Sequence, residues 1–195
     1  MLEQLKNLDR ILLLSINAHH SSIIDTIMWN FSSTIPTVIL ICIFAYFFFK
    51  KFGNKKTISF VFGCIIVFAF TDSTSNAAKH SFKRYRPTYN LEIKAKIHKV
   101  NNYEGGKYGF FSGHSATTFG LTIFIFLCAK WIKLKTKILF FIYPLFVVYS
   151  RMYLGAHYPS DIIFGFLDGL FFGSLVFYLF NRYLFKFNED KIITT

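Results

Sequence analysis

The sequence predicts an all-α fold, a polytopic transmembrane helix bundle of about five spans with an N-terminal helix at the membrane surface. Of the 195 residues, 53% are hydrophobic and 27 are Phe, more than a soluble domain of this length could bury. Long apolar runs alternate with short segments that carry most of the charges. The length and the lack of internal repeats favour a single domain over residues 1–195.

The first segment, residues 1–22, is expected to form an amphipathic helix. Leu5, Leu8 and Leu12 follow a roughly helical spacing, and Lys6 and Arg10 lie between them. The segment is too short and too charged to cross a bilayer, so we expect it to lie along the interface. Its apolar run is also too short for the core of a cleavable signal peptide.

Five apolar stretches follow and are expected to cross the membrane. The predicted spans are residues 23–49, 57–79, 112–131, a fourth beginning with 138–149, and 159–185. Residues 50–56 and 130–137 are short turns with four Lys each. Residues 80–111 form the one long connection, and a loop of this length in a compact protein is usually functional.

The distribution of Lys predicts the orientation. Short loops weigh most in the positive-inside rule, so the turns 50–56 and 130–137 are expected on the cytoplasmic side, together with Lys186 and Lys191 near the end of the chain. The loop 80–111 would then face the periplasm or the cell exterior from a cytoplasmic membrane. The net charge of +12 suits membrane anchoring and capture of anionic headgroups better than nucleic-acid binding, because the cations lie between apolar runs.

The three cysteines, Cys42, Cys64 and Cys128, all fall inside apolar runs. They fit neither a disulfide framework nor a zinc site, and we interpret them as small packing residues. The sequence shows no cluster of Asp, Glu and His with the spacing of a metal site. We therefore expect neither a metal nor another cofactor.

Three polar islands interrupt the apolar pattern. The first, Lys79 to Pro87, reads KxxxxxxRP; the second, Phe111 to His114, reads FSGH; the third, Ser150 to Asp161, reads SRxxxxxHxxxD. Charged groups at a membrane boundary cost free energy unless they are paired or used, so they indicate a functional site. The topology above places all three islands on one side of the membrane.

The cations and the helix start within these islands suit a phosphate group. Guanidinium groups match phosphate oxygens bidentately and an ammonium adds a point charge, so Lys79, Arg86 and Arg151 are candidate phosphate ligands. Ser112 is a good N-cap and Gly113 permits close approach, at a helix start whose free N–H groups bind anions. The structural alternatives are three surface cations with their charged ends in water, and an ordinary N-cap.

Two histidines and a carboxylate complete the candidate site. A carboxylate that binds one ring nitrogen of a histidine fixes its tautomer and leaves the other nitrogen free as a nucleophile. Asp161, four residues after His157, could orient that ring, while His114 would act on the bridging oxygen. Alternatively, Asp161 only caps the last helix, whose first turn is marked by Pro159.

Together, the three islands resemble the signature of the type-2 phosphatidic acid phosphatase family, with Phe111 in place of the Pro of PSGH. This family includes bacterial lipid phosphatases and is related to glucose-6-phosphatase and the vanadium haloperoxidases. The resemblance implies a metal-independent phosphatase in which His157 attacks phosphorus and His114 protonates the leaving oxygen. It also implies that phosphate is bound by Lys79, Arg86, Ser112, Gly113 and Arg151.

The expected partners are a phosphorylated lipid and the bilayer, with no nucleic acid and no obligate protein partner. Candidate lipids are undecaprenyl diphosphate, lipid A, phosphatidylglycerol phosphate and phosphatidic acid, and the Lys-rich segment 94–107 favours the first two. A phosphotransferase with the same site is an alternative. So is an anionic-lipid carrier, although it would need the cations but not both histidines, and a scaffold would need none of the islands.

Overall fold

The computed structural model describes residues 2–185, so Lys186 and Lys191 lie outside this range. Its main helices are α1 (Leu2–Ala18), α2 (Ser22–Phe31), α3 (Ile35–Phe82), α4 (Gly113–Cys128), α5 (Leu134–Ile138), α6 (Ile142–Tyr153) and α7 (Pro159–Phe180). A π-helical turn, Asn181–Phe185, follows α7, and the 3₁₀ turns Pro87–Tyr89, Lys94–Lys96 and Val100–Asn102 lie between α3 and α4. No strand occurs within the described range, so the all-α prediction is confirmed.

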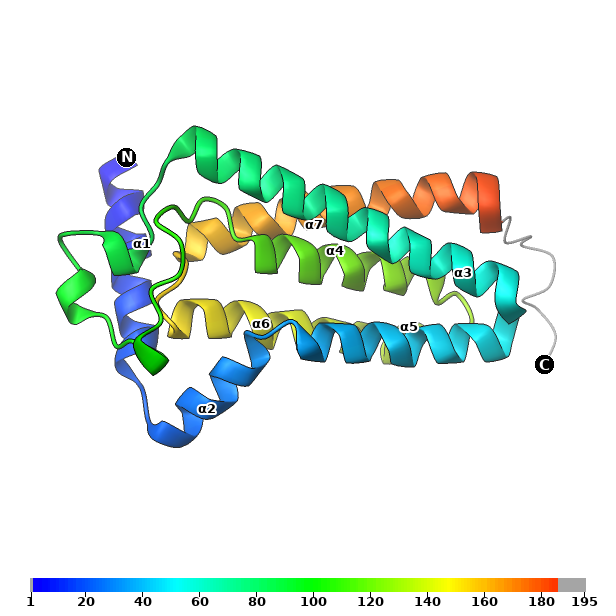
Figure 1. Ribbon diagram of the computed structural model, residues 1–195, viewed down its shortest axis with the longest axis horizontal. Helices are drawn as coiled ribbons and strands as arrows, with labels where there is room; N and C mark the ends of the chain where they lie inside the picture. The colour runs from blue at the N-terminus through cyan, green and yellow to red at the C-terminus, as the bar shows by residue number, and fades with distance from the viewer. Residues whose placement is uncertain (1, 186–195) are drawn as a thin grey trace.

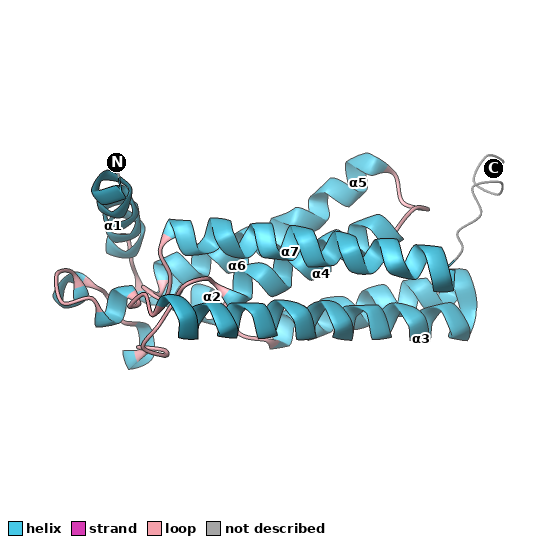
Figure 2. Cartoon of the chain, turned by 90° about the horizontal axis from the view of Figure 1, so that it is seen from above, coloured by secondary structure: helices cyan, strands magenta, loops and turns pink. Residues whose placement is uncertain are grey.

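The long helices run side by side along the long axis of the bundle, and α1 lies across one end (Figures 1 and 2). Helix α3 reverses direction at Gly53, and its two arms lie antiparallel (Figure 1). Gly53 has a φ of 74°, which a residue without a Cβ adopts readily. One residue therefore reverses the chain, and the predicted Lys-rich turn 50–56 is helical on both sides of Gly53.

The stretch predicted as the first span, residues 23–49, is broken into two helices. Helix α2 ends at Phe31 and α3 begins at Ile35, with Ser32, Ser33 and Thr34 between them. Pro36 lies in the first turn of α3, where its missing N–H costs nothing. The break places Ser32 beside the polar islands.

The segment 130–137, expected to be a turn, contains part of the short helix α5. Lys and Leu are good helix formers, and this segment has no Gly or Pro to prevent a helical turn. Lys137 Nζ donates a hydrogen bond to the Phe126 carbonyl oxygen at 3.2 Å, near the C-terminus of α4. The segment therefore caps α4 while it connects α4 to α6.

Helices α4 and α7 pack closely because of a row of glycines. Gly165, Gly169 and Gly173, four residues apart, lie on one face of α7. A Cβ atom on these glycines would lie 2.5, 2.4 and 2.4 Å from the carbonyl oxygens of Ser112, Ala116 and Gly120, respectively. Only glycine permits such contact between helix backbones. The same packing joins the second and third islands, since the Ser112 N–H donates to the Asp161 carbonyl oxygen at 3.0 Å.

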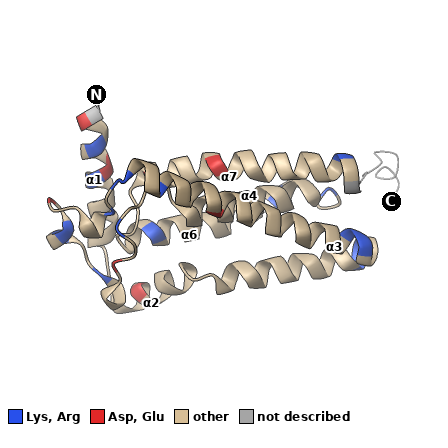
Figure 3. Cartoon of the chain, turned by 45° about the horizontal axis from the view of Figure 1, so that its top comes forward, with Lys and Arg blue, Asp and Glu red and all other residues tan. Residues whose placement is uncertain are grey.

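The bundle has the surface of a membrane protein. Two segments, Ile35–Phe82 and Pro159–Tyr183, are long and apolar enough to cross a bilayer, and Gly113–Cys128 is a shorter apolar helix. Large apolar side chains are exposed along the bundle, among them Ile39, Ile58, Phe62 and Phe171. Figure 3 shows Lys and Arg gathered where α3 reverses, at the end opposite the islands.

Candidate active site

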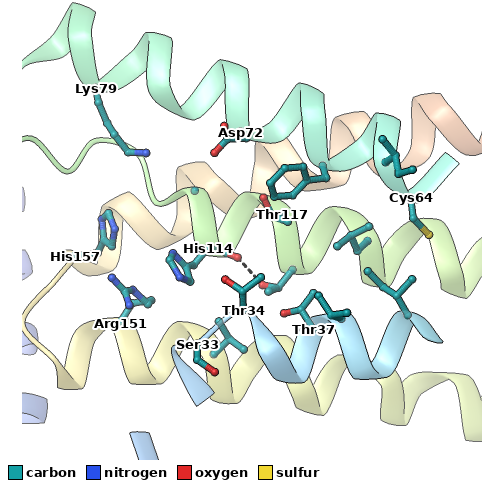
Figure 4. Close-up of a pocket in the computed structure, with 18 of the residues that line it drawn as sticks. Ser33, Thr34, Thr37, Cys64, Asp72, Lys79, His114, Thr117, Arg151 and His157 are labelled. Carbon is teal, nitrogen blue, oxygen red and sulfur yellow. Dashed lines mark hydrogen bonds between the residues drawn. The ribbon is translucent and has the colours of Figure 1, made fainter. Parts of the chain in front are cut away.

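The three islands meet at the end of the bundle that α1 crosses. A cavity of about 580 Å³ opens there. Six of the eight candidate residues line it: Lys79, Arg86, Gly113, His114, Arg151 and His157. Lys79, His114, Arg151 and His157 are labelled in Figure 4. Ser112 and Asp161 are fully buried and do not line the cavity. Ser112 directly precedes the lining residue Gly113, and Asp161 Oδ2 lies 3.6 Å from Nδ1 of the lining residue His157. The cavity continues between apolar side chains that include Val38, Ile41, Ile65 and Phe68.

Lys79 reaches the start of α4 from the last turns of α3. Its Nζ donates hydrogen bonds to Asn76 Oδ1 at 3.1 Å and Ser75 Oγ at 3.3 Å. A Cβ on Gly113 would lie 2.9 Å from Ser75 Oγ, so glycine is needed for this approach. Ser112 is the N-cap of α4, as expected, and its Oγ accepts a hydrogen bond from the Ser115 N–H at 3.3 Å.

Two arginines from distant parts of the chain share one phenol. Arg151, 3% exposed at the last turn of α6, donates from Nη2 to the Tyr103 hydroxyl at 2.9 Å. Arg86 approaches the same oxygen from Nη1 at 3.5 Å and donates from Nε to the Tyr108 carbonyl at 3.2 Å. Arg151 Nη1 also contacts Ser32 Oγ. These guanidinium groups converge from separate elements on one point at the cavity.

Tyr103 lines the cavity, although the sequence analysis did not predict it as a site residue. Burial would raise the pKa of its phenol, but the guanidinium groups of Arg151 and Arg86 lower it below the ordinary value. The available signal was an aromatic hydroxyl within the one long loop. Ser32 was missed because it lies in a stretch that was assigned to a continuous span.

The two histidines have different partners. His114 Nε2 lies 3.2 Å from the Ser32 carbonyl oxygen, so this nitrogen carries the proton when it makes that hydrogen bond. His157 is 1% exposed and lies between α6 and α7. Burial, followed by the charges of Arg86 and Arg151, holds the pKa of His157 well below its ordinary value of 6.5. A neutral ring is the form that can act as a nucleophile.

Asp161 faces His157 but is held by other groups. Its Oδ2 lies 3.6 Å from His157 Nδ1, beyond hydrogen-bond length, and that nitrogen is buried without a partner. The same Oδ2 accepts the Tyr158 N–H at 3.0 Å, and Oδ1 accepts Arg84 Nη1 at 2.7 Å. Asp161 is thus a helix cap and an ion-pair partner, and a shift of under 1 Å would bring it into hydrogen-bond range of His157.

A family comparison covers the part of the chain that holds these residues. Residues 56–185 match the PAP2 superfamily, a region that contains all three islands. The chain belongs to the PAP2 superfamily. The resemblance inferred from the three islands is thereby confirmed.

Two curated relatives are similar over almost the whole chain. The chain is 31% identical to the lipid A 4'-phosphatase of Bacteroides thetaiotaomicron, over 97% of this chain and 84% of that protein. It is 30% identical to the lipid A 4'-phosphatase of Porphyromonas gingivalis, over 93% of this chain and 77% of that protein. Among solved structures, a PAP2-type phosphatidylglycerolphosphate phosphatase from Bacillus subtilis has the same fold, with a TM-score of 0.71 at 18% identity, covering 92% and 88% of the two chains.

These findings identify the chain as a phosphoric ester hydrolase of membrane lipids, associated with the membrane through its apolar helices. The islands place Lys79, Arg86 and Arg151 at the cavity together with His114 and His157. The apolar extension of the cavity suits the lipid part of such a substrate.

Proposed function

We propose that this protein removes a phosphate from lipid A or a closely similar phosphorylated saccharide lipid. The observation that carries the proposal is the extent of the similarity to two lipid A 4'-phosphatases. A match over 97% of the chain includes α1 and α2, which lie before the superfamily region at 56–185. Undecaprenyl diphosphate is the second candidate, because its headgroup also carries more than one anionic group.

The shape of the site supports a lipid with a large polar head. The cavity places the candidate phosphate ligands at one end and apolar side chains such as Val38, Ile65 and Phe68 along the rest. The loop after α3 forms a second, open recess of about 850 Å³, whose lining includes Tyr85, Tyr89 and three Lys residues. Aromatic rings and cations beside the phosphate site would suit a phosphorylated sugar.

In the proposed mechanism, the neutral His157 ring attacks phosphorus while the phosphate oxygens are held by Lys79, Arg86 and Arg151. The bond from phosphorus to the lipid oxygen breaks. His114, which binds a proton once the phosphate anion offsets the neighbouring cations, gives that proton to the lipid oxygen. The product of this step is a phosphohistidine and a lipid alcohol. The cations offset the negative charge on the equatorial oxygens throughout.

In the second step, His114 takes a proton from water, and the water oxygen attacks the phosphorus of the phosphohistidine. The bond between nitrogen and phosphorus breaks, which releases phosphate and regenerates the neutral His157 ring. Acceptance by a lipid hydroxyl instead of water would make the protein a phosphotransferase. The fate of ³²P from a labelled substrate, free phosphate or a second lipid, distinguishes the two reactions.

The proposed topology has five membrane crossings: the two arms of α3, then α4, α6 and α7. Helix α1 would lie in the interface, which its position across the end of the bundle supports (Figure 1). The islands and the loop 83–112 would face the periplasm or the exterior, because both short Lys-rich segments, 50–56 and 130–137, lie toward the other side.

The test is phosphate release by the purified protein in detergent from lipid A, undecaprenyl diphosphate, phosphatidylglycerol phosphate and phosphatidic acid, with and without EDTA. We expect the highest kcat/KM with lipid A, no loss of activity with EDTA, and an acid-labile ³²P-protein adduct that is absent from His157→Ala. A preference for another lipid would overturn the substrate assignment. A requirement for Mg²⁺, or an adduct that persists in His157→Ala, would overturn the mechanism.

A further inference from the structure

An ion-pair network connects the N-terminal helix to the candidate active site. Arg84, two residues before Arg86, donates from Nη1 to Asp161 Oδ1 and from Nη2 to Asp9 Oδ2, at 2.7 Å in both cases. Asp9 lies in the middle of α1, more than 150 residues before Asp161 in the chain. A single guanidinium group therefore bridges two carboxylates from opposite ends of the protein.

Both carboxylates of the bridge are buried, and the Arg84 side chain between them is partly buried, with 27% of it exposed. Asp9 is only 9% exposed and Asp161 is 0% exposed. Burial would lower the pKa of Arg84, but Asp161 and Asp9 raise it above its ordinary value. A buried carboxylate without a cation would be costly, so the guanidinium group of Arg84 offsets part of the cost of burying Asp9 and Asp161.

Further contacts fix the geometry of the bridge. The Ser160 N–H donates to Asp9 Oδ1 at 2.9 Å, and Ser160 Oγ contacts Asp9 Oδ2. Arg84 Nη1 also donates to Ser160 Oγ at 2.6 Å, and its guanidinium carbon lies 4.2 Å from the centre of the Tyr158 ring. Helix α1 is thus attached to the first turn of α7, the turn that carries Asp161.

We propose that Arg84 and Asp9 are positioning residues that hold Asp161 in place beside His157, which makes α1 part of the active-site scaffold. The inference rests on the proposed role of Asp161 as the partner of His157. Arg84 occupies Oδ1, so Oδ2 stays directed at His157 Nδ1, 3.6 Å away. Asp9 acts through Arg84 because it binds the other end of the same guanidinium group.

Variants of this network should change other kinetic constants than variants of the candidate phosphate ligands. Arg86 and Arg151 line the cavity, whereas Arg84 is held between two carboxylates. Loss of Arg84 should therefore lower kcat and leave KM nearly unchanged. Loss of a phosphate ligand should raise KM as well.

The test compares Arg84→Met, in the loop after α3, and Asp9→Asn, on α1, with two control variants on α1. Arg10→Met removes a guanidinium of α1 that pairs with the exposed Glu92, and Glu3→Gln changes an exposed acid of α1. We expect Arg84→Met to lower kcat ~10–100-fold, by analogy with groups that orient the ligands of a metal ion. Asp9→Asn should have a smaller effect in the same direction, and both controls should match wild type.

A double-mutant cycle gives the decisive readout. Asp161→Asn should lower kcat, and adding Arg84→Met to it should cause little further loss, because no carboxylate remains to be positioned. If Arg84→Met does not fold, as judged by thermal unfolding in detergent, Arg84→Lys replaces it in the cycle. Multiplied losses in the double variant, an unchanged kcat in Arg84→Met, or a rise in KM alone would overturn the inference.

The assay can use any phosphorylated lipid that the wild-type protein hydrolyses. If the substrate assignment is wrong, another lipid is used in the assay, but the ratio of the kcat of each variant to that of wild type is unaffected. Failure of the substrate proposal and failure of this inference are therefore separate results.

Discussion

The Tyr103 hydroxyl lies 2.9 Å from Arg151 Nη2, on the point where two candidate phosphate ligands converge. When a phosphate group binds, both guanidinium groups can turn to its oxygens, and the phenol is left as an O–H donor beside them. The loop between α3 and α4 would then contribute directly to substrate binding. Residues that bind a substrate often lie on loops that a rigid scaffold holds in place.

We expect Tyr103→Phe to raise KM several-fold with little change in kcat, because it removes a hydrogen bond next to a charged group, worth about 1.5–3 kcal/mol at most. Steady-state kinetics on a soluble phosphate ester and on a lipid measure this. Tyr108→Phe is the control, since Tyr108 contacts Arg86 through its backbone carbonyl. A lower KM in Tyr103→Phe would show instead that the phenol competes with phosphate.

His157→Ala should lower turnover by at least ~10³-fold while the protein stays folded, because the variant lacks the proposed nucleophile. The comparison is His80→Ala, which removes an exposed ring from the last turn of α3. Phosphate release and thermal unfolding are measured on both variants. Turnover within tenfold of wild type in His157→Ala would exclude a phosphohistidine at this position.

The protonation of His157 can be measured directly. Since burial and the two guanidinium groups lower its folded pKa below 6.5, the ring should be neutral in the free protein at pH 6.5 and bind a proton only at lower pH. Binding of inorganic phosphate should raise this pKa, because the anion offsets Arg86 and Arg151. The ¹⁵N shifts of the ring, assigned with His157→Gln, report both effects. A titration midpoint of His157 at or above pH 6.5 without phosphate would contradict a buried ring beside Arg86 and Arg151.

Because α4 packs closely against the glycines of α7, a methyl group added to one of them should lower the stability of the fold. Gly169→Ala places a Cβ 2.4 Å from the Ala116 carbonyl oxygen and should destabilise the fold by about 1–3 kcal/mol, the usual range for overpacking. Gly106→Ala is the control, because its Cβ would meet no atom within 4 Å. Thermal unfolding in detergent compares them. Equal stability of the two variants would mean that α4 and α7 are further apart than described.

The proposed orientation can be tested by labelling single cysteines on intact cells, after Cys42, Cys64 and Cys128 are replaced. Lys96→Cys, in the loop near the site, should react with an impermeant thiol reagent, and Asn54→Cys, beside the α3 reversal, should react only after the membrane is opened. Both positions are exposed. The opposite pattern would place the site in the cytoplasm.

The polar islands and their order could be predicted from the sequence because they are local patterns. A residue such as Arg151 stands out within an apolar run, and its spacing to His157 and Asp161 is visible without a structure. The start of α7 at Pro159 and the N-cap at Ser112 are equally local, since they depend on backbone geometry within a few residues. The break at Ser32–Thr34 was missed, because hydropathy alone does not report a short interruption before Pro36.

The helical class, the superfamily and the candidate site residues can be inferred from the amino-acid sequence, because composition and short-range spacing encode them. The partners of those residues, in contrast, depend on the tertiary structure. Arg84 bridges Asp9 and Asp161, and Tyr103 joins Arg86 to Arg151, through contacts between segments far apart in the chain. Such pairs depend on how the helices and the loop after α3 pack against one another, and no local sequence pattern reports that packing.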